Sequence, residues 1–142
     1  MFINHEKLTL PISTLRYYDK EGFFPNLVRK GNIRYFSNNE IEALRLIECL
    51  KKSGLGIKEI NQFFTWVSQG SASYENRKEL FEARKLAVEA EIKNLQKTLS
   101  LLEFKCWYYS KAMEDGTEEY IREMLPDKLP SDIQKLYDAS RE

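Results

Sequence analysis

The chain has 142 residues, of which 42% are hydrophobic, 13% aromatic and 31% charged, and its formal net charge is zero. This length allows one ordinary domain, or a small domain with an extension. No apolar run approaches the roughly 20 residues of a membrane span. The N-terminus lacks the apolar core of a signal peptide, so we expect a cytoplasmic protein. The two cysteines, Cys49 and Cys106, share no metal-ligand spacing, and we expect neither a disulfide scaffold nor a bound metal.

The charges are unevenly distributed along the chain. Residues 1–58 carry ten Lys/Arg against six Asp/Glu, a net charge of +4. Residues 59–142 carry twelve against sixteen, a net charge of −4. A basic N-terminal half is a modest electrostatic sign of a polyanionic partner.

Two short helices are predicted near the N-terminus. The first runs from about Asn4 to Leu8 and includes the single histidine, His5, which we interpret as an ordinary surface residue. Pro11 suits the first position of the second helix, which comprises most of the segment STLRYYDKEGFF. Ile12 and Leu15 are expected on its inward face.

The outward face of this second helix is unusual for a small protein. A hydroxyl, a guanidinium, a phenol and an ammonium share one narrow arc at helical spacing, and they belong to Ser13, Arg16, Tyr17 and Lys20. Simple amphipathic packing explains Tyr18, which lies on the side of Leu15. It explains Arg16 and Tyr17 poorly, and these two residues indicate a binding surface.

A tight β-hairpin and a capped helix are predicted next. The segment PNLVRKGNIRYF places short β-prone runs on both sides of Gly31 and Asn32, a pair typical of a hairpin turn. Residues 37–40 read as a capping box, in which Ser37 and Glu40 satisfy backbone N–H groups of the first helical turn. The helix that they begin should end at Gly54.

Another helix is predicted from about Ile57 to Val67, followed by the small-residue segment SQGSAS. This segment is the expected hinge or domain boundary. The apolar stripe of the helix is expected to consist of Ile57, Ile60, Phe64 and Val67.

The longest predicted helix runs from Glu75 to Met113. Its apolar residues follow an a/d heptad with one lapse at Lys85, and they are Phe81, Val88, Ile92, Leu95, Leu99, Leu102, Cys106, Tyr109 and Met113. The sequence predicts no second helix of this length to cover that seam, so we expect it to meet a copy of itself in a homodimer. The interface should centre on Val88, Ile92, Leu95, Leu99 and Leu102.

The predicted fold is mainly α, a winged helix-turn-helix head with a small β-hairpin wing, followed by a long dimerisation helix that forms a coiled coil. We expect a DNA-binding domain over residues 1–69, the dimerisation helix over residues 70–115, and a short tail over residues 116–142 with one or two helices packed on the coil. In this fold the second helix enters a major groove, and a two-fold dimer requires a pseudo-palindromic site.

The polar arc then has a chemical interpretation. Ser13 and Tyr17 can donate hydrogen bonds to phosphate oxygens, and Arg16 can fork onto a phosphate or a guanine edge. Lys20 adds positive charge. In the wing, Lys30 and Arg34 are expected to bind phosphates.

The segments STLRYYDKEGFFPN, RYFS..EI and LIECLKKSGLGIKEI, with the long helix after them, resemble the MerR family of bacterial transcription regulators from Leu8 to about Gly116. The resemblance implies a four-helix winged head and an activator whose dimer bends and untwists promoter DNA on the nucleoid so that RNA polymerase can engage. Carried over by position, Arg34 and Tyr35 are wing contacts. The predicted DNA contacts are Ser13, Thr14, Arg16, Tyr17, Lys20, Lys30, Arg34 and Tyr35.

Cys49 is a candidate sensor of the regulatory signal. Arg45 lies one turn before it and Lys52 one turn after it, and such cations favour a thiolate. Its context, LIECLKKSGL, also resembles the aldehyde- or electrophile-responsive (AdhR/NmlR-like) subgroup of the family, with a single cysteine at this place. The mechanism implied is modification of that thiolate, which alters packing between the head and the long helix. Alternatively, Cys49 only packs in its helix, and Cys106 acts as a small hydrophobe of the coil.

The sequence alone leaves other functions open. The regulator could respond to a non-covalent small ligand, or the chain could be a coiled-coil interaction protein without DNA binding, although that leaves the basic wing without a role. The sequence has no Gly-rich phosphate loop, no paired histidines and no nucleophile with an apparent base, so we expect neither an enzyme nor a cofactor.

Overall fold

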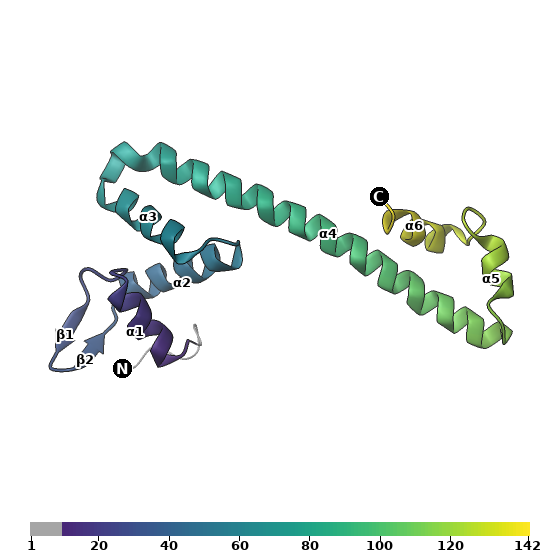
Figure 1. Ribbon diagram of the computed structural model, residues 1–142, viewed down its shortest axis with the longest axis horizontal. Coiled ribbons are helices and arrows are strands. Elements are labelled where there is room, and N and C mark those ends of the chain that lie inside the picture. Colours follow the sequence, from purple (N-terminus) through teal and green to yellow (C-terminus); the bar gives the residue numbers. More distant parts are fainter. Residues whose placement is uncertain (1–9) are drawn as a thin grey trace. The chain divides into compact units, whose positions relative to one another are not determined.

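The computed structural model describes residues 10–142, so the helix expected over Asn4–Leu8 and the surface residue His5 lie outside the described residues. The elements follow one another as in Figure 1, with one short two-stranded sheet among helices. They are α1 (Ile12–Lys20), β1 (Val28–Lys30), β2 (Ile33–Tyr35), α2 (Asn38–Lys52), α3 (Ile57–Ser68), the 3-10 helix η1 (Gly70–Ser73), α4 (Tyr74–Asp115), α5 (Glu119–Met124) and α6 (Ser131–Ala139). The mainly α fold with a hairpin wing is confirmed.

The chain forms two compact units, which we call the head unit, ending at Leu86, and the tail unit, beginning at Ala87. Both units include part of α4. Within residues 10–142, no helix is long and apolar enough to cross a membrane.

The head unit has one hydrophobic core, made by α1, the segment after it, α2 and α3. Its buried members are Leu15, Tyr18, Phe23, Phe24, Leu44, Ile47, Leu50, Ile60 and Phe63. The beginning of α4 joins this core, since Leu80 packs against it and the rings of Phe63 and Phe81 lie 5.5 Å apart, edge to face. Arg84 of α4 also donates a hydrogen bond to the carbonyl oxygen of Ser53 after α2, at 3.1 Å.

Three details of the expected helices were wrong. Ile12 is 55% exposed, because the buried stripe of the short helix α1 consists of Leu15 and Tyr18. Val67 is 42% exposed, and Phe63 is the buried residue in its place, because the inward face of α3 advances in steps of three from Ile60. Pro11 is the N-cap of α1 and not its first helical residue, with its carbonyl accepting the N–H groups at residues 14 and 15.

The hairpin and the capping box were predicted correctly. Strands β1 and β2 pair antiparallel, with Val28 opposite Tyr35 and Lys30 opposite Ile33, so Gly31 and Asn32 form the two-residue turn. The N–H of Ser37 donates to the carboxylate of Glu40 at 3.0 Å, which begins α2 as expected.

The segment between α3 and α4 is an ordered turn with its own hydrogen bonds. Ser73 is 1% exposed, and its hydroxyl donates to the carbonyl oxygens of Trp66 and Gly70. Arg77 of α4 also donates to the Gly70 carbonyl at 2.8 Å. The role of the segment SQGSAS as a hinge or domain boundary stays a prediction.

In the tail unit, α5 and α6 pack on the last turns of α4, as predicted for the tail. The buried residues of this second core are Phe104, Tyr108, Ile121, Leu129 and Ile133. Further back along α4, the heptad leucines are exposed in the single chain, with Leu95 at 67%, Leu99 at 53% and Leu102 at 57%. Both cysteines are exposed as well.

Candidate nucleic-acid interface

Helix α1 presents its polar arc because its other face is anchored. Leu15 and Tyr18 are 2% and 1% exposed and fix the rotation of the helix on the core. The spacing of 3.6 residues per turn then turns Arg16 and Tyr17 outward, and Tyr17 is 45% exposed. Ser13 and Lys20 are exposed as predicted, while Thr14 is half-buried.

The anchor of α1 includes a polar contact that the sequence did not reveal. The hydroxyl of Tyr18 donates to Oε1 of Glu48 at 2.7 Å and accepts from Nζ of Lys51 at 2.7 Å, so α1 is bonded to α2. Burial raises the pKa of Tyr18, which stays a neutral phenol at physiological pH, and the hydrogen bond to Tyr18 raises the pKa of Lys51. A buried tyrosine hydroxyl needs a partner, but the sequence does not say which helix supplies it.

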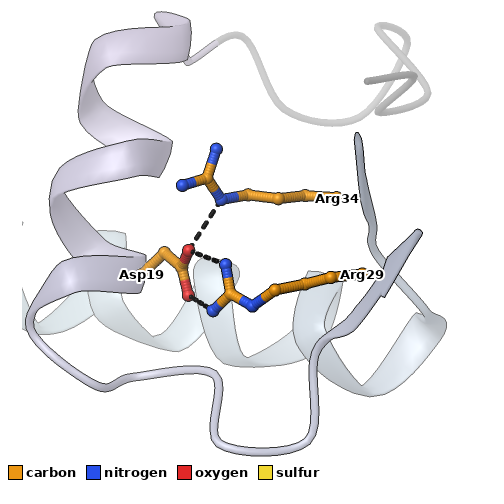
Figure 2. Close-up of polar contacts among 3 residues, drawn as sticks. All are labelled: Asp19, Arg29 and Arg34. Carbon is orange, nitrogen blue, oxygen red and sulfur yellow. Dashed lines mark hydrogen bonds and ion pairs between the residues drawn. The ribbon is translucent and has the colours of Figure 1, made fainter. Parts of the chain in front are cut away.

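A carboxylate joins α1 to the wing. Both terminal nitrogens of Arg29 donate to Asp19, at 2.6 and 2.5 Å, and Nε of Arg34 donates to the same carboxylate at 2.6 Å. Figure 2 shows the two guanidinium groups, one from each strand, converging on Asp19. The Asp19 side chain is only 5% exposed. The two hydrogen bonds from Arg29, with the one from Arg34, hold the pKa of Asp19 below its ordinary value, so this carboxylate is ionised at neutral pH.

Sequence reasoning missed Asp19 and Arg29. The signal that could have identified them lies in the hairpin register, because a turn at Gly31 and Asn32 places Arg29 directly opposite Arg34 on one face. Two opposed arginines repel, and an acid on a neighbouring element is then the natural partner.

A hollow of about 400 Å³ lies between α1 and the wing. It is lined by Arg16, Arg29, Gly31, Asn32, Ile33 and Arg34. Three of these residues are arginines, so the hollow can accept an anion such as a phosphate group. At the wing's surface, the ammonium of Lys30 lies 5.7 Å from the ring centre of Tyr35, and both residues are exposed.

The candidate sensor Cys49 is exposed on α2. Its predicted neighbour Arg45 has a carboxylate partner, Glu42, at 3.7 Å, and Lys52 is exposed. The packing interpretation of Cys49 is wrong for the single chain, because its side chain is not buried. Between residues 10 and 142, no three His, Cys, Asp or Glu side chains are grouped as metal ligands would be.

Residues 5–65 match the family described as MerR HTH family regulatory protein. An uncharacterised HTH-type transcriptional regulator of Haemophilus influenzae is 39% identical over 114 residues, which cover 79% of this chain and 84% of the relative. The chain belongs to the MerR family. This MerR protein is therefore a transcription regulator of a DNA-binding, non-enzymatic family.

Two further similarities concern the subgroup. AdhR of Bacillus subtilis is 32% identical to this MerR protein over 72 residues, which cover 50% of the chain and 51% of AdhR. Among solved structures, the crystal structure of HiNmlR, a MerR family regulator lacking the sensor domain, bound to promoter DNA, superposes with a TM-score of 0.69. The sequence identity is 36%, over 82% of this chain and 93% of HiNmlR. The resemblance to the AdhR/NmlR-like subgroup is confirmed.

Proposed function

We propose that this MerR family regulator binds double-stranded promoter DNA through α1 and the wing. The observation that carries the proposal is the hollow where the outward face of α1 meets the arginines of the wing. A helix of this kind fits the major groove, and a short basic hairpin beside it reaches the adjacent backbone. HiNmlR, with a similar fold, was crystallised on promoter DNA. The proposed contacts are Ser13, Thr14, Arg16, Tyr17, Lys20, Lys30, Arg34 and Tyr35.

Individual roles follow from exposure and bonding. Arg16 is exposed and can fork onto a guanine edge, the commonest specific contact in a major groove. Arg34 bonds Asp19 through Nε, which leaves its two terminal nitrogens available to a phosphate. Tyr17 offers a phenol hydroxyl from the same face of α1, and its proposed role is to donate a hydrogen bond to a phosphate oxygen of the DNA backbone.

The regulator acts as a homodimer held by α4. Its exposed leucines form a stripe at heptad spacing, and a contiguous apolar surface of this kind marks an interaction site. The proposed interface residues are Val88, Ile92, Leu95, Leu99 and Leu102. In this proposal residues 1–69 are the DNA-binding domain, residues 70–115 the dimerisation helix, and residues 116–142 a tail that packs on α4.

The dimer acts on the nucleoid, binds a pseudo-palindromic promoter element, and activates transcription by distorting the DNA so that RNA polymerase engages. This part of the proposal rests on membership of the MerR family. Two copies of α1 related by a two-fold axis match a site with the same symmetry.

The signal proposed is an electrophile that modifies Cys49. The exposure of this thiol supports the proposal, because a sensor thiol must be reachable. Lys52 and Arg45 supply positive charge one turn away on either side. A second candidate is a small non-covalent ligand in an apolar hollow of about 190 Å³ in the head unit, whose lining includes Phe23, Phe24 and Phe64.

DNA binding can be tested with a duplex selected from a random library by the wild-type protein. We expect Arg34→Ala to weaken binding to all sequences and to reduce the slope of log K against log salt by about one charge. Arg16→Ala should also relax the sequence preference, by about 1–3 kcal/mol at one base pair. Lys93→Ala, which removes an exposed lysine of α4, is the control for net charge. Unchanged affinity in both arginine variants would remove the assignment of this surface.

The sensor can be tested by labelling the native protein with iodoacetamide across pH and assigning the modified site by mass spectrometry. Cys106 is the internal reference, since both thiols are exposed in the single chain and only Cys49 has a cation one helical turn away on each side. We expect Cys49 to react first, and Cys49→Ser to lose induction by an aldehyde or quinone while it retains DNA binding. A variant that still responds to electrophiles would direct attention to the aromatic hollow.

A further inference from the structure

The wing has little packing of its own. Each strand has three residues, all of β1 is exposed, and only Arg34 of β2 is half-buried. An isolated two-stranded hairpin of this size is marginally stable in water. The wing must therefore be held in place by contacts made outside the strand pairing, at its base or through its side chains.

The register of the hairpin sets two positive charges against each other. Arg29 and Arg34 are directly opposed across the ladder, and like charges at such a pair destabilise it. The carboxylate of Asp19 lies between both guanidinium groups and accepts three hydrogen bonds of 2.5 to 2.6 Å from them (Figure 2). One residue of α1 thus offsets the repulsion and bonds both strands of the wing to the helix.

We propose that Asp19 is a positioning residue for DNA binding, which locks the wing onto α1 so that Arg29 and Arg34 face the same phosphate as Arg16. This inference rests on the proposed DNA-binding function. Arg34 gives only Nε to Asp19, and Arg29 is still 49% exposed, so both side chains keep N–H groups for a phosphate. The three arginines line one hollow only while the wing keeps this place.

The proposal predicts an unusual direction for the change in DNA affinity when Asp19 is replaced. A carboxylate on a DNA-binding surface repels phosphates, so its removal should strengthen binding if charge alone mattered. If Asp19 positions the arginines, its removal weakens binding although the protein becomes more positive. Glu21 is a matched control, because it lies two residues further along the chain and, among residues 10–142, accepts only a long hydrogen bond of 3.4 Å from Asn61.

The experiment measures binding of Asp19→Asn, Asp19→Glu and Glu21→Gln to the duplex selected by the wild-type protein, at several salt concentrations. We expect Asp19→Asn to bind about tenfold more weakly, because charge-assisted hydrogen bonds are lost. Its salt slope should fall by about one phosphate contact, which a general loss of stability does not produce. Asp19→Glu should recover part of the affinity, and Glu21→Gln should bind as tightly as the wild type or more tightly.

A charge-conserving variant keeps the test valid if Asp19→Asn does not fold. Arg29→Lys keeps the positive charge at an exposed position but loses the fork that grips Asp19. We expect it to weaken binding and to lower the salt slope in the same direction. Equal or tighter binding by Asp19→Asn, or wild-type binding by Arg29→Lys, would overturn the positioning role. Failure of the wild-type protein to select any duplex would instead reject the proposed function.

Discussion

The head unit and the middle of α4 use the same apolar side chains with opposite results. In the head unit, Leu44 and Ile47 are fully buried by residues of the same chain. On α4, Leu95 and Leu99 are 67% and 53% exposed although they follow a regular heptad. The difference separates the part of the fold that one chain completes alone from the part that, in our proposal, a second copy covers.

The two ends of α4 sharpen this contrast. Near its beginning, Leu80 packs on the head core, and near its end Phe104 and Tyr108 are buried under α5 and α6. The leucines between these two regions are not covered. A single chain that covers both ends of a helix and leaves the apolar middle open is consistent with a seam reserved for a second copy.

The largest effect should come from the double variant Leu95→Ala/Leu99→Ala. Each truncation costs about 2–5 kcal/mol per buried site if the seam is packed as a core. Sedimentation should then show monomer or unfolded chain. Leu86→Ala/Leu101→Ala removes two leucines of the same helix outside the heptad seam, 67% and 43% exposed, and should remain dimeric. A stable dimer of the first variant would mean that the interface lies elsewhere.

A smaller effect is expected from Ile47→Ala in the head core. The site is fully buried within one chain, so the loss of about 2–5 kcal/mol should appear in thermal unfolding while sedimentation still shows a dimer. Ile12→Ala is the control, because Ile12 is 55% exposed and its truncation should change stability by less than about 0.5 kcal/mol. Dissociation of the Ile47 variant would contradict the separation of core and seam.

Local signals in the sequence predicted most of the fold. Gly31 with Asn32 specified the hairpin turn, and Ser37 with Glu40 specified the start of α2, because both depend on residues that are near in sequence. The predicted inward face of α3 was partly wrong, since Phe63 and Phe64 are adjacent and periodicity alone does not decide which one faces inward.

The polar contacts that hold the candidate site could not be predicted in the same way. Asp19 bonds residues ten and fifteen positions away, and Tyr18 bonds residues thirty and thirty-three positions away. Such pairs depend on how the helices pack, and several acids and cations of the chain could have served as partners. The exposed arc of α1 was predictable, because the spacing of residues on a helix fixes it.

The adjacent tyrosines of α1, Tyr17 and Tyr18, offer a third test, in which the expected change in stability is of intermediate size. Tyr18→Phe removes the hydroxyl that links Glu48 to Lys51, and we expect a loss of about 1–3 kcal/mol in the free energy of unfolding. Tyr17→Phe removes an exposed hydroxyl and should leave stability within about 0.5 kcal/mol of the wild type while it weakens DNA binding. Thermal unfolding and binding isotherms of both variants measure the contrast. If the two variants changed stability equally, Tyr18 could not be distinguished from Tyr17 as the residue that anchors α1 to α2.

The smallest effect is expected from protonation of Asp19, which should lower the stability of the protein at acidic pH. In the unfolded chain Asp19 has an ordinary pKa of about 3.9. In the folded chain, hydrogen bonds from Arg29 and Arg34 lower that pKa. As the pH falls toward and below about 4, the unfolded state therefore binds the proton first, and the contribution of Asp19 to stability declines until the pH has passed the folded value. Above that window the contribution is fully present.

Urea unfolding at pH 6 and in steps down to about pH 3 should show this loss in the wild-type protein. Asp19→Asn has no carboxylate to titrate, so its stability should fall less over the same steps. Glu21→Gln removes a carboxylate without disturbing the wing and should follow the wild type more closely. If Asp19→Asn and the wild type lose stability in parallel, the carboxylate does not hold the wing in solution. The contrast between a wing fixed by one charge and a head fixed by its core would then disappear.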